Sequence, residues 1–238
     1  MANSEIRAIL FDKDGTLIDF FASWTPAYMA AAEGVAHDVG TPGLSDRLLL
    51  AGGYDPKTHT IEPTSVLACG NNAEIAELWT REPELAHLDP ADLSRRITNI
   101  FNGIIMGNPK PVTDLQRLFE KLKGRGLGIG VATSDSTEGA KLTLSHFGVL
   151  EMMDYVAGFD AGFGAKPGPG MVHGFCDRLG VDAGAVAVVG DSLHDLDMAR
   201  AAGAGLAIGV LTGVSDRATL DPHADHVLDS IAQLESVL

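Results

Sequence analysis

The chain has 238 residues, of which 45% are hydrophobic and 21% are charged, as is typical of a soluble globular protein with one large domain or two smaller ones. Its 32 acidic residues outnumber 17 lysines and arginines, so the formal net charge is −15. No basic stripe is present, which makes nucleic acids and anionic membranes poor candidate partners, whereas a metal ion and a few aimed donors could still bind a small anion.

The first predicted element is a short apolar run, residues 8–11, which has the length and composition of a buried strand. From residue 20 to about residue 108 the apolar residues follow helical periods, and no strand is expected there. The helices predicted in this block cover residues 24–35, 46–50, 71–79 and 90–105. Asp46, Asn71 and Asp89 suit the N-cap positions of the last three helices. The block therefore indicates a small, all-helical insertion.

From residue 113 onward, predicted helices and strands alternate. The expected helices cover residues 113–123, 137–147, 170–179, 193–202 and 231–238. The expected strands cover residues 127–132, 155–158, 185–189, 205–210 and 226–228. This alternation predicts an α/β fold with a doubly wound parallel sheet, whose strands are joined by right-handed crossovers. Residues 1–19 and 109–238 would form this core domain, residues 20–108 the helical domain, and residues 109–111 the returning hinge.

Two carboxylates, Asp12 and Asp14, follow the first predicted strand, one residue apart. Side chains alternate along a strand, so both can point the same way only while the backbone stays extended, and Gly15 permits a sharp exit. Parallel sheets bind ligands at the carboxyl ends of their strands. No local base is expected to pair with these acids, so their burial would need a cation or a reaction. The alternative is a solvated loop in which they serve as turn or cap residues.

Thr133 follows the predicted strand 127–132. At this position it can offer a hydroxyl and a backbone amide to an anion at a helix N-terminus. The three residues after it, Ser134, Asp135 and Ser136, are each suitable N-caps for the next helix. We therefore expect Thr133 to bind an anion while one of its neighbours caps the helix.

Three further charged residues fall near predicted strand ends. Lys166 lies in a loop rich in proline and glycine, which restricts the backbone around the charge. Asp191 follows the strand 185–189 and its closing glycine, and is expected to face the same pocket as Asp12. Asp195 falls in the first turn of the following helix, where a favourable interaction with the helix dipole is the alternative explanation.

Four motifs in this order resemble those of the haloacid dehalogenase (HAD) superfamily of hydrolases, in the branch with a helical cap inserted after the first strand. The motifs are residues 12–16, Thr133, residues 166–167, and residues 190–191 with Asp195. They span the whole predicted core domain. Within the superfamily, the sequence is similar to phosphoglycolate phosphatases and their relatives. The resemblance also implies that the cap closes over the site and reads the leaving group.

The resemblance implies a Mg²⁺-dependent phosphatase that hydrolyses a small, phosphoglycolate-like phosphate monoester through an aspartyl-phosphate. The catalytic residues that it implies are Asp12 as nucleophile, Asp14 as general acid and base, Thr133 and Lys166. The phosphate-binding residues that it implies are Thr133, Ser134 and Lys166. The metal ligands that it implies are Asp12, Asp14 through its backbone carbonyl, and Asp191. Asp195 would orient metal-bound water without touching the metal.

Other activities of the superfamily stay open. A sugar-phosphate mutase is one alternative. Cleavage of a C–P bond, as by phosphonoacetaldehyde hydrolase, is another, but it needs a cap lysine for a Schiff base, and only Lys57 lies between the first motif and the hinge. Asp14 separates this chain from dehalogenases, which lack an acid there. Outside the enzymes, a phosphate-binding module would lack one of the two leading acids, and a signalling receiver would lack the inserted helices.

The expected setting is the cytoplasm. Cys69 and Cys176 have no redox or metal-ligand spacing, which indicates reduced thiols. No secretory signal is visible, and no stretch approaches the roughly 20 apolar residues of a membrane span. We expect a monomer or homodimer whose partner is a small phosphorylated metabolite, with no nucleic acid and no membrane.

Overall fold

The computed structural model describes residues 5–105 and 109–238. The chain divides into two compact units. The α/β unit consists of Met1–Phe20 and Lys110–Leu238, and the helical unit consists of Phe21–Pro109. Within the described residues, no helix is both long and apolar enough to cross a membrane.

A six-stranded parallel sheet forms the centre of the α/β unit, with strand order β5-β4-β1-β6-β7-β8. Its strands are β1 (Ala8–Phe11), β4 (Gly128–Ala132), β5 (Tyr155–Ala157), β6 (Val186–Gly190), β7 (Leu206–Val210) and β8 (His226–Leu228). In this order β1 lies between β4 and β6, and Phe11 pairs with Val131 on one side and Val189 on the other. The carboxyl ends of these three strands therefore meet at one edge of the sheet.

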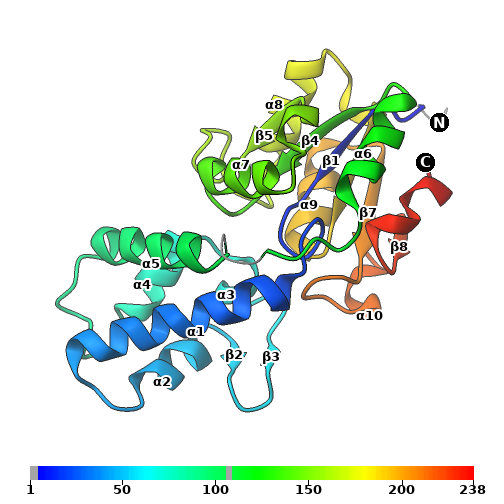
Figure 1. Ribbon diagram of the computed structural model, residues 1–238. Helices are drawn as coiled ribbons and strands as arrows, with labels where there is room; N and C mark the ends of the chain where they lie inside the picture. Colours follow the sequence, from blue (N-terminus) through cyan, green and yellow to red (C-terminus); the bar gives the residue numbers. More distant parts are fainter. Residues whose placement is uncertain (1–4, 106–108) are drawn as a thin grey trace. The chain divides into compact units, whose positions relative to one another are not determined.

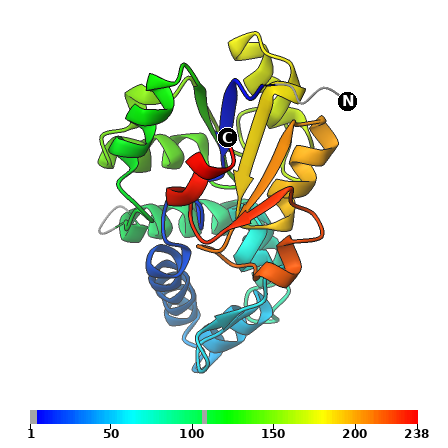
Figure 2. The same ribbon diagram turned by 90° about the vertical axis from the view of Figure 1, so that its right-hand side faces the viewer.

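Helices cover both faces of this sheet, as Figure 2 shows for the α/β unit. They are α6 (Leu115–Gly124), α7 (Thr137–His146), α8 (Gly170–Leu179), α9 (Leu193–Ala202) and α10 (Arg217–Leu220), with 3₁₀ turns η1 (Leu150–Met152), η2 (Ala183–Ala185) and η3 (Ile231–Ser236). Alternate residues of β1 enter the two apolar cores. Ile9 and Phe11 pack with α6, α7 and η3, while Ala8 and Leu10 pack with α8, α9 and α10. The predicted doubly wound α/β fold is confirmed.

Local differences from the prediction in this unit have local causes. The first helix after the hinge begins at Leu115 and not at residue 113, because the Asp114 side chain accepts a hydrogen bond from Arg117 N (3.0 Å) and caps the helix there. The last predicted helix is the 3₁₀ turn η3. The short helix α10 lies in a segment for which no element was predicted.

Within the described residues, the helical unit contains a long first helix, four shorter helices and a short hairpin (Figure 1). Its helices are α1 (Phe20–Val39), α2 (Leu44–Ala51), α3 (Val66–Cys69), α4 (Asn72–Trp79) and α5 (Pro90–Ile105). Two predicted N-caps are confirmed: Asn71 forms a capping box with Glu74, and Asp89 accepts from Ala91 N at 2.9 Å. Asp46 was wrongly predicted as a cap, because α2 begins two residues earlier, after Gly43.

A two-residue hairpin ladder interrupts the otherwise helical unit. Strand β2 (Tyr54–Asp55) pairs with β3 (Thr60–Ile61) in antiparallel fashion. The expectation of no strand between residues 20 and 108 is therefore wrong at this point. The ladder was missed because two residues per strand are too few to show an alternation of apolar and polar side chains.

Candidate active site

The side chains singled out in the sequence converge at the carboxyl edge of the sheet. Asp12 directly follows β1, Thr133 follows β4 and Asp191 follows β6. Asp195 lies in the first turn of α9, and Lys166 reaches the same edge from the loop before α8. Asp12 is 7% exposed, so the alternative of a solvated loop does not hold for it. The partly exposed Ser134 lies beside Thr133 in the loop before α7.

Lys166 holds two carboxylates together. Its Nζ lies 2.6 Å from Asp12 Oδ1 and 2.5 Å from Asp195 Oδ1, and all three side chains are buried. The other oxygen of Asp195, Oδ2, accepts from Ser192 Oγ (2.6 Å) and Ser192 N (3.2 Å) in a capping box. Both oxygens of Asp195 are therefore engaged by the protein, and this residue both caps α9 and fixes Lys166.

The site contains more negative charge than its lysine neutralises. Burial raises the pKa of Asp12 to about 7, although the Lys166 ammonium acts in the opposite direction. Burial, with the nearby Asp12 carboxylate, also raises the pKa of Asp191 well above its usual value. For Lys166, burial lowers the pKa, but the Asp12 and Asp195 carboxylates outweigh it and raise the pKa above its usual value. Additional positive charge would therefore stabilise the ionised carboxylates of this site.

Oxygen atoms suited to a hard divalent cation are present here. One carboxylate oxygen each from Asp12, Asp191 and Asp195 lie within 4.8 Å of one another. Asp12 Oδ2 is buried and has no hydrogen-bond partner among the residues that the structure describes, whereas Asp195 already uses both oxygens. Carboxylate oxygens in such a cluster are the ligands that Mg²⁺ takes in proteins. Asp12 and Asp191 therefore fit direct binding of Mg²⁺, and Asp195 fits a supporting position.

Two glycines make room for the Asp191 carboxylate. A Cβ added to Gly15 would lie 2.6 Å from Asp191 Oδ2, and one added to Gly213 would lie only 1.9 Å from the same atom. Val214 N donates to Asp191 Oδ2 (2.8 Å), and Thr212 Oγ1 donates to the carbonyl oxygen of Gly15 (2.6 Å). The loop after β7, which none of the sequence motifs includes, thus fixes Asp191 and the turn after Asp14.

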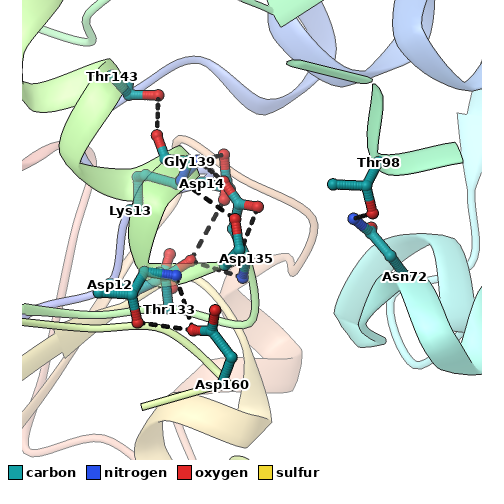
Figure 3. A network of polar contacts seen from close by, with 12 residues as sticks. Asp12, Lys13, Asp14, Asn72, Thr98, Thr133, Asp135, Gly139, Thr143 and Asp160 are labelled. Atoms are coloured by element: carbon teal, nitrogen blue, oxygen red, sulfur yellow. Dashed lines mark hydrogen bonds and ion pairs between the residues drawn. The ribbon is translucent and has the colours of Figure 1, made fainter. Parts of the chain in front are cut away.

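The second leading acid, Asp14, is paired with a lysine, which corrects the expectation that no local base would be present. Lys13 is completely buried, and its Nζ lies 2.8 Å from Asp14 Oδ1 and 3.1 Å from Asp135 Oδ2. Figure 3 shows Lys13 between these two carboxylates. The signal was present in the sequence, because a lysine stands directly between the two acids of the first motif.

Thr133 contributes less than predicted. Its hydroxyl lies 3.5 Å from Asp14 Oδ2, which brings these two predicted residues together. Its backbone N–H, however, donates to the carbonyl oxygen of Ala157 at 2.9 Å, so the prediction that this amide faces an anion is wrong. Of the three candidate caps for α7, Ser136 is the N-cap and accepts from Gly139 N at 3.1 Å.

Comparison with known proteins identifies the family. The family model of haloacid dehalogenase-like hydrolases matches residues 6–203, and the chain belongs to this family. "Probable phosphatase IndB" of Dickeya dadantii is 31% identical over 206 residues, which are 87% of this chain and 81% of that protein. A phosphoglycolate phosphatase of Neisseria meningitidis is 26% identical over 223 residues, 92% of this chain and 86% of that protein.

The fold comparison agrees with the family assignment. The crystal structure of a predicted phosphoglycolate phosphatase from Haemophilus somnus superposes with a TM-score of 0.73 and 20% identity, over 98% of this chain and 97% of the other. At this identity the match shows the fold alone. With the family and its phosphatase relatives established, the chain is a phosphoric monoester hydrolase of the HAD family.

Proposed function

We propose that this phosphatase depends on Mg²⁺ and hydrolyses a small, phosphoglycolate-like phosphate monoester through an aspartyl-phosphate on Asp12. The observation that supports the proposal most is the state of Asp12: it is buried, one oxygen contacts Lys166, and the other oxygen has no hydrogen-bond partner within residues 5–105 and 109–238. The lysine fixes the orientation of this carboxylate, while its second oxygen accepts no hydrogen bond from the described residues. This arrangement suits a nucleophile that also binds a cation.

The proposed reaction has two displacements at phosphorus. When bound by Asp12, Asp191 and the backbone carbonyl of Asp14, Mg²⁺ supplies the positive charge that offsets the phosphate dianion. A carboxylate oxygen of Asp12 attacks phosphorus in line, and the bond from phosphorus to the alkoxide breaks. Water then attacks the same phosphorus, which releases inorganic phosphate and restores the Asp12 carboxylate. Asp14 protonates the departing alkoxide and then accepts a proton from the water.

The phosphate oxygens are held by donors around this position. Thr133 offers its hydroxyl, Ser134 its hydroxyl and Lys166 its ammonium, which donates where charge spreads over the equatorial oxygens. Lys166 also holds Asp12 in place at 2.6 Å. Asp195 accepts from Lys166 and thereby orients the lysine, and it would also orient water bound to the cation.

A screen of phosphorylated metabolites with added Mg²⁺, using p-nitrophenyl phosphate as a generic substrate, tests the proposal. We expect release of inorganic phosphate from p-nitrophenyl phosphate and from small phosphate monoesters, with 2-phosphoglycolate among the better substrates. Isomerisation of a sugar phosphate without net phosphate release would support the mutase alternative. Cleavage of phosphonoacetaldehyde would support the C–P alternative. Activity on none of these would contradict the proposal.

Chelation is expected to abolish activity, and Mg²⁺ to restore it, with an affinity that rises with pH. Burial raises the pKa of metal-free Asp12 to about 7, so Mg²⁺ must displace a proton below that pH. The apparent affinity should therefore fall by about tenfold per pH unit below pH 7. Between pH 3.8 and about pH 7, Asp12 of the folded metal-free protein binds a proton that the same residue of the unfolded chain has released. The stability of the metal-free protein should therefore fall as the pH rises through this range.

The measurement is the Mg²⁺ dependence of the melting temperature at several pH values on either side of neutrality, beside the activity assay. The melting curves of the metal-free protein give the pH dependence of stability from the same samples. An affinity for Mg²⁺ that is the same at pH 6 and pH 8 would contradict the assignment of Asp12 as a ligand.

Replacing Asp14 by asparagine is expected to slow the release of poor leaving groups far more than that of p-nitrophenolate. An alkoxide must be protonated as it departs, and loss of a general acid costs about 10²–10⁴-fold, whereas p-nitrophenolate departs unprotonated. The measurement is kcat for Asp14→Asn on 2-phosphoglycolate and on p-nitrophenyl phosphate. Equal losses on the two substrates would count against the acid role of Asp14.

A further inference from the structure

We propose that Lys13 and Asp135 are positioning residues that hold the Asp14 carboxyl in the orientation needed to protonate the leaving group. The inference rests on the proposed function, because it assigns to these residues an effect exerted through the general acid. Neither residue belongs to the set of site residues inferred from the sequence motifs. Both lie within the described residues at the carboxyl edge of the sheet, one after β1 and the other after β4.

The contacts form a closed ring of four residues, in which one link is made by the backbone amide of Asp135 (Figure 3). Lys13 Nζ contacts Asp14 Oδ1 at 2.8 Å and Asp135 Oδ2 at 3.1 Å. The other oxygen of Asp14, Oδ2, accepts from Thr133 Oγ1 at 3.5 Å, and Thr133 Oγ1 accepts from Asp135 N at 3.1 Å. Asp135 therefore touches both groups that flank Asp14: its carboxylate holds the lysine, and its amide fixes the direction of the threonine hydroxyl.

The two carboxylate oxygens of Asp14 make different contacts in this ring. Oδ1 makes a short, charge-assisted contact with a buried ammonium, which fixes the position of the carboxyl group. The Thr133 hydroxyl approaches Oδ2 at 3.5 Å, the long limit of a hydrogen bond, and the Asp14 side chain keeps 14% of its surface exposed, against 1% for Lys13. Because the Lys13 ammonium already engages Oδ1, we expect a leaving group to take its proton from Oδ2.

Asp135 is itself held rigidly. Ser136 N donates to Asp135 Oδ1 at 2.7 Å, next to the first turn of α7. Gly139 allows the carboxylate to lie against the helix, since a Cβ there would be 2.8 Å from Asp135 Oδ2. The start of α7 thus fixes Asp135, Asp135 fixes Lys13, and Lys13 fixes Asp14. A buried ion pair of this kind contributes little to net stability compared with apolar residues, so its use here is better explained by orientation.

Without the lysine, Asp14 and Asp135 would face each other with no ammonium between them. The two carboxyl groups would turn apart, which moves the proton donor away from the leaving oxygen. A displacement of about 1 Å in a reacting group can cost 10²-fold in rate. This loss falls only on substrates that need the proton, and that feature separates positioning from a general loss of structure.

The test is a double-mutant cycle between Lys13 and Asp14, with saturating Mg²⁺. Methionine replaces the buried lysine with a side chain of similar length. We expect Lys13→Met to lower kcat on 2-phosphoglycolate by about 10²-fold, and on p-nitrophenyl phosphate by no more than about threefold. In the Asp14→Asn background the same change should add nothing to the ratio of the two rates, because the group that it positions is gone. Asp135→Asn should shift the ratio in the same direction by a smaller factor.

Thr143→Val is the matched control for structural damage. Thr143 Oγ1 donates to the carbonyl oxygen of Gly139 at 3.0 Å in helix α7, and Thr143 is buried like Lys13, but its hydrogen bond in the described part of the chain is not to a ring residue. The Thr143→Val variant should have a lower melting temperature than the parent and the same ratio of the two rates. If Lys13→Met does not fold, the ratio of the rates on 2-phosphoglycolate and p-nitrophenyl phosphate is measured for Asp135→Asn, and an unchanged ratio there would overturn the positioning role.

The outcomes separate this inference from the proposed function. Selective loss for Asp14→Asn without selective loss for Lys13→Met and Asp135→Asn would overturn the positioning role alone. A ratio in the double variant that equals the product of the single effects would also overturn it. No selectivity for Asp14→Asn would overturn the acid role of Asp14, and the positioning role with it.

Discussion

Replacing Asp12 by asparagine is expected to abolish hydrolysis of every phosphate ester, with a loss of roughly 10⁴-fold or more in kcat. Asparagine keeps the size of the side chain but cannot attack phosphorus to form the acyl phosphate. The loss should be the same for good and poor leaving groups, in contrast to the selective loss expected for Asp14→Asn. The measurement is phosphate release from p-nitrophenyl phosphate and 2-phosphoglycolate.

The fold of the Asp12→Asn variant should survive, because the substitution removes one of three clustered, buried carboxylates. Burial already raises the pKa of Asp12 to about 7, so the ionised form is the costly one. We expect the metal-free variant to melt at the same temperature as the parent or higher, and to gain less from Mg²⁺. Asp225→Asn is the control for the loss of a carboxylate in the same unit but outside the site. Asp225 accepts a hydrogen bond from Ala207 N at the start of β7. Retained activity in Asp12→Asn would show that the nucleophile is assigned wrongly.

Much of the core domain follows from sequence patterns that extend over several residues. The buried strands and their alternation with helices are local features, and the structure agrees with them within one or two residues. The position of Asp12 and Asp191 at one sheet edge follows from the topology, because each directly follows a strand. In a parallel sheet the ends of neighbouring strands β1 and β6 must meet.

The contacts of the site that come from elsewhere could not be predicted in this way. The loop after β7 reaches Asp191 through Val214 N, yet its residues are ordinary turn residues in the sequence. The contact of Lys13 with Asp135 was equally undetermined, because the two residues belong to segments far apart in the sequence. The pairing of β1 with β4 places these segments side by side, and the structure shows Lys13 Nζ 3.1 Å from Asp135 Oδ2. The Thr133 amide was misjudged because its partner, Ala157, belongs to a different strand.

The second large effect is expected for Lys166→Met, which should inactivate the enzyme and destabilise it in a pH-dependent manner. Asp12 and Asp195 would lose the ammonium that lies 2.6 Å and 2.5 Å from their oxygens. Removal of one member of a buried ion pair typically costs about 3–5 kcal/mol, because the other member is left unpaired. The phosphate would also lose a charged donor at the atoms where charge accumulates.

The pH dependence gives this prediction a specific sign. Without Lys166 the pKa of Asp12 should rise further, because burial already raises it and the lysine is what lowers it. The folded variant would then bind protons that the unfolded chain releases, so its stability should fall as pH rises through and above neutrality. Thermal melts of metal-free Lys166→Met at pH 5 and pH 8 measure this, and the deficit against the parent should be larger at pH 8.

Lys121→Met provides the matched substitution outside the site. Lys121 pairs with Glu235 at 2.8 Å, but both side chains are more than 40% exposed, so the pair contributes little and the variant should melt like the parent at both pH values. High Mg²⁺ should recover part of the stability of Lys166→Met, because the cation supplies charge to the same carboxylates, but not its activity. A Lys166→Met variant with parental stability at pH 8 would mean that the lysine does not hold these acids together in solution.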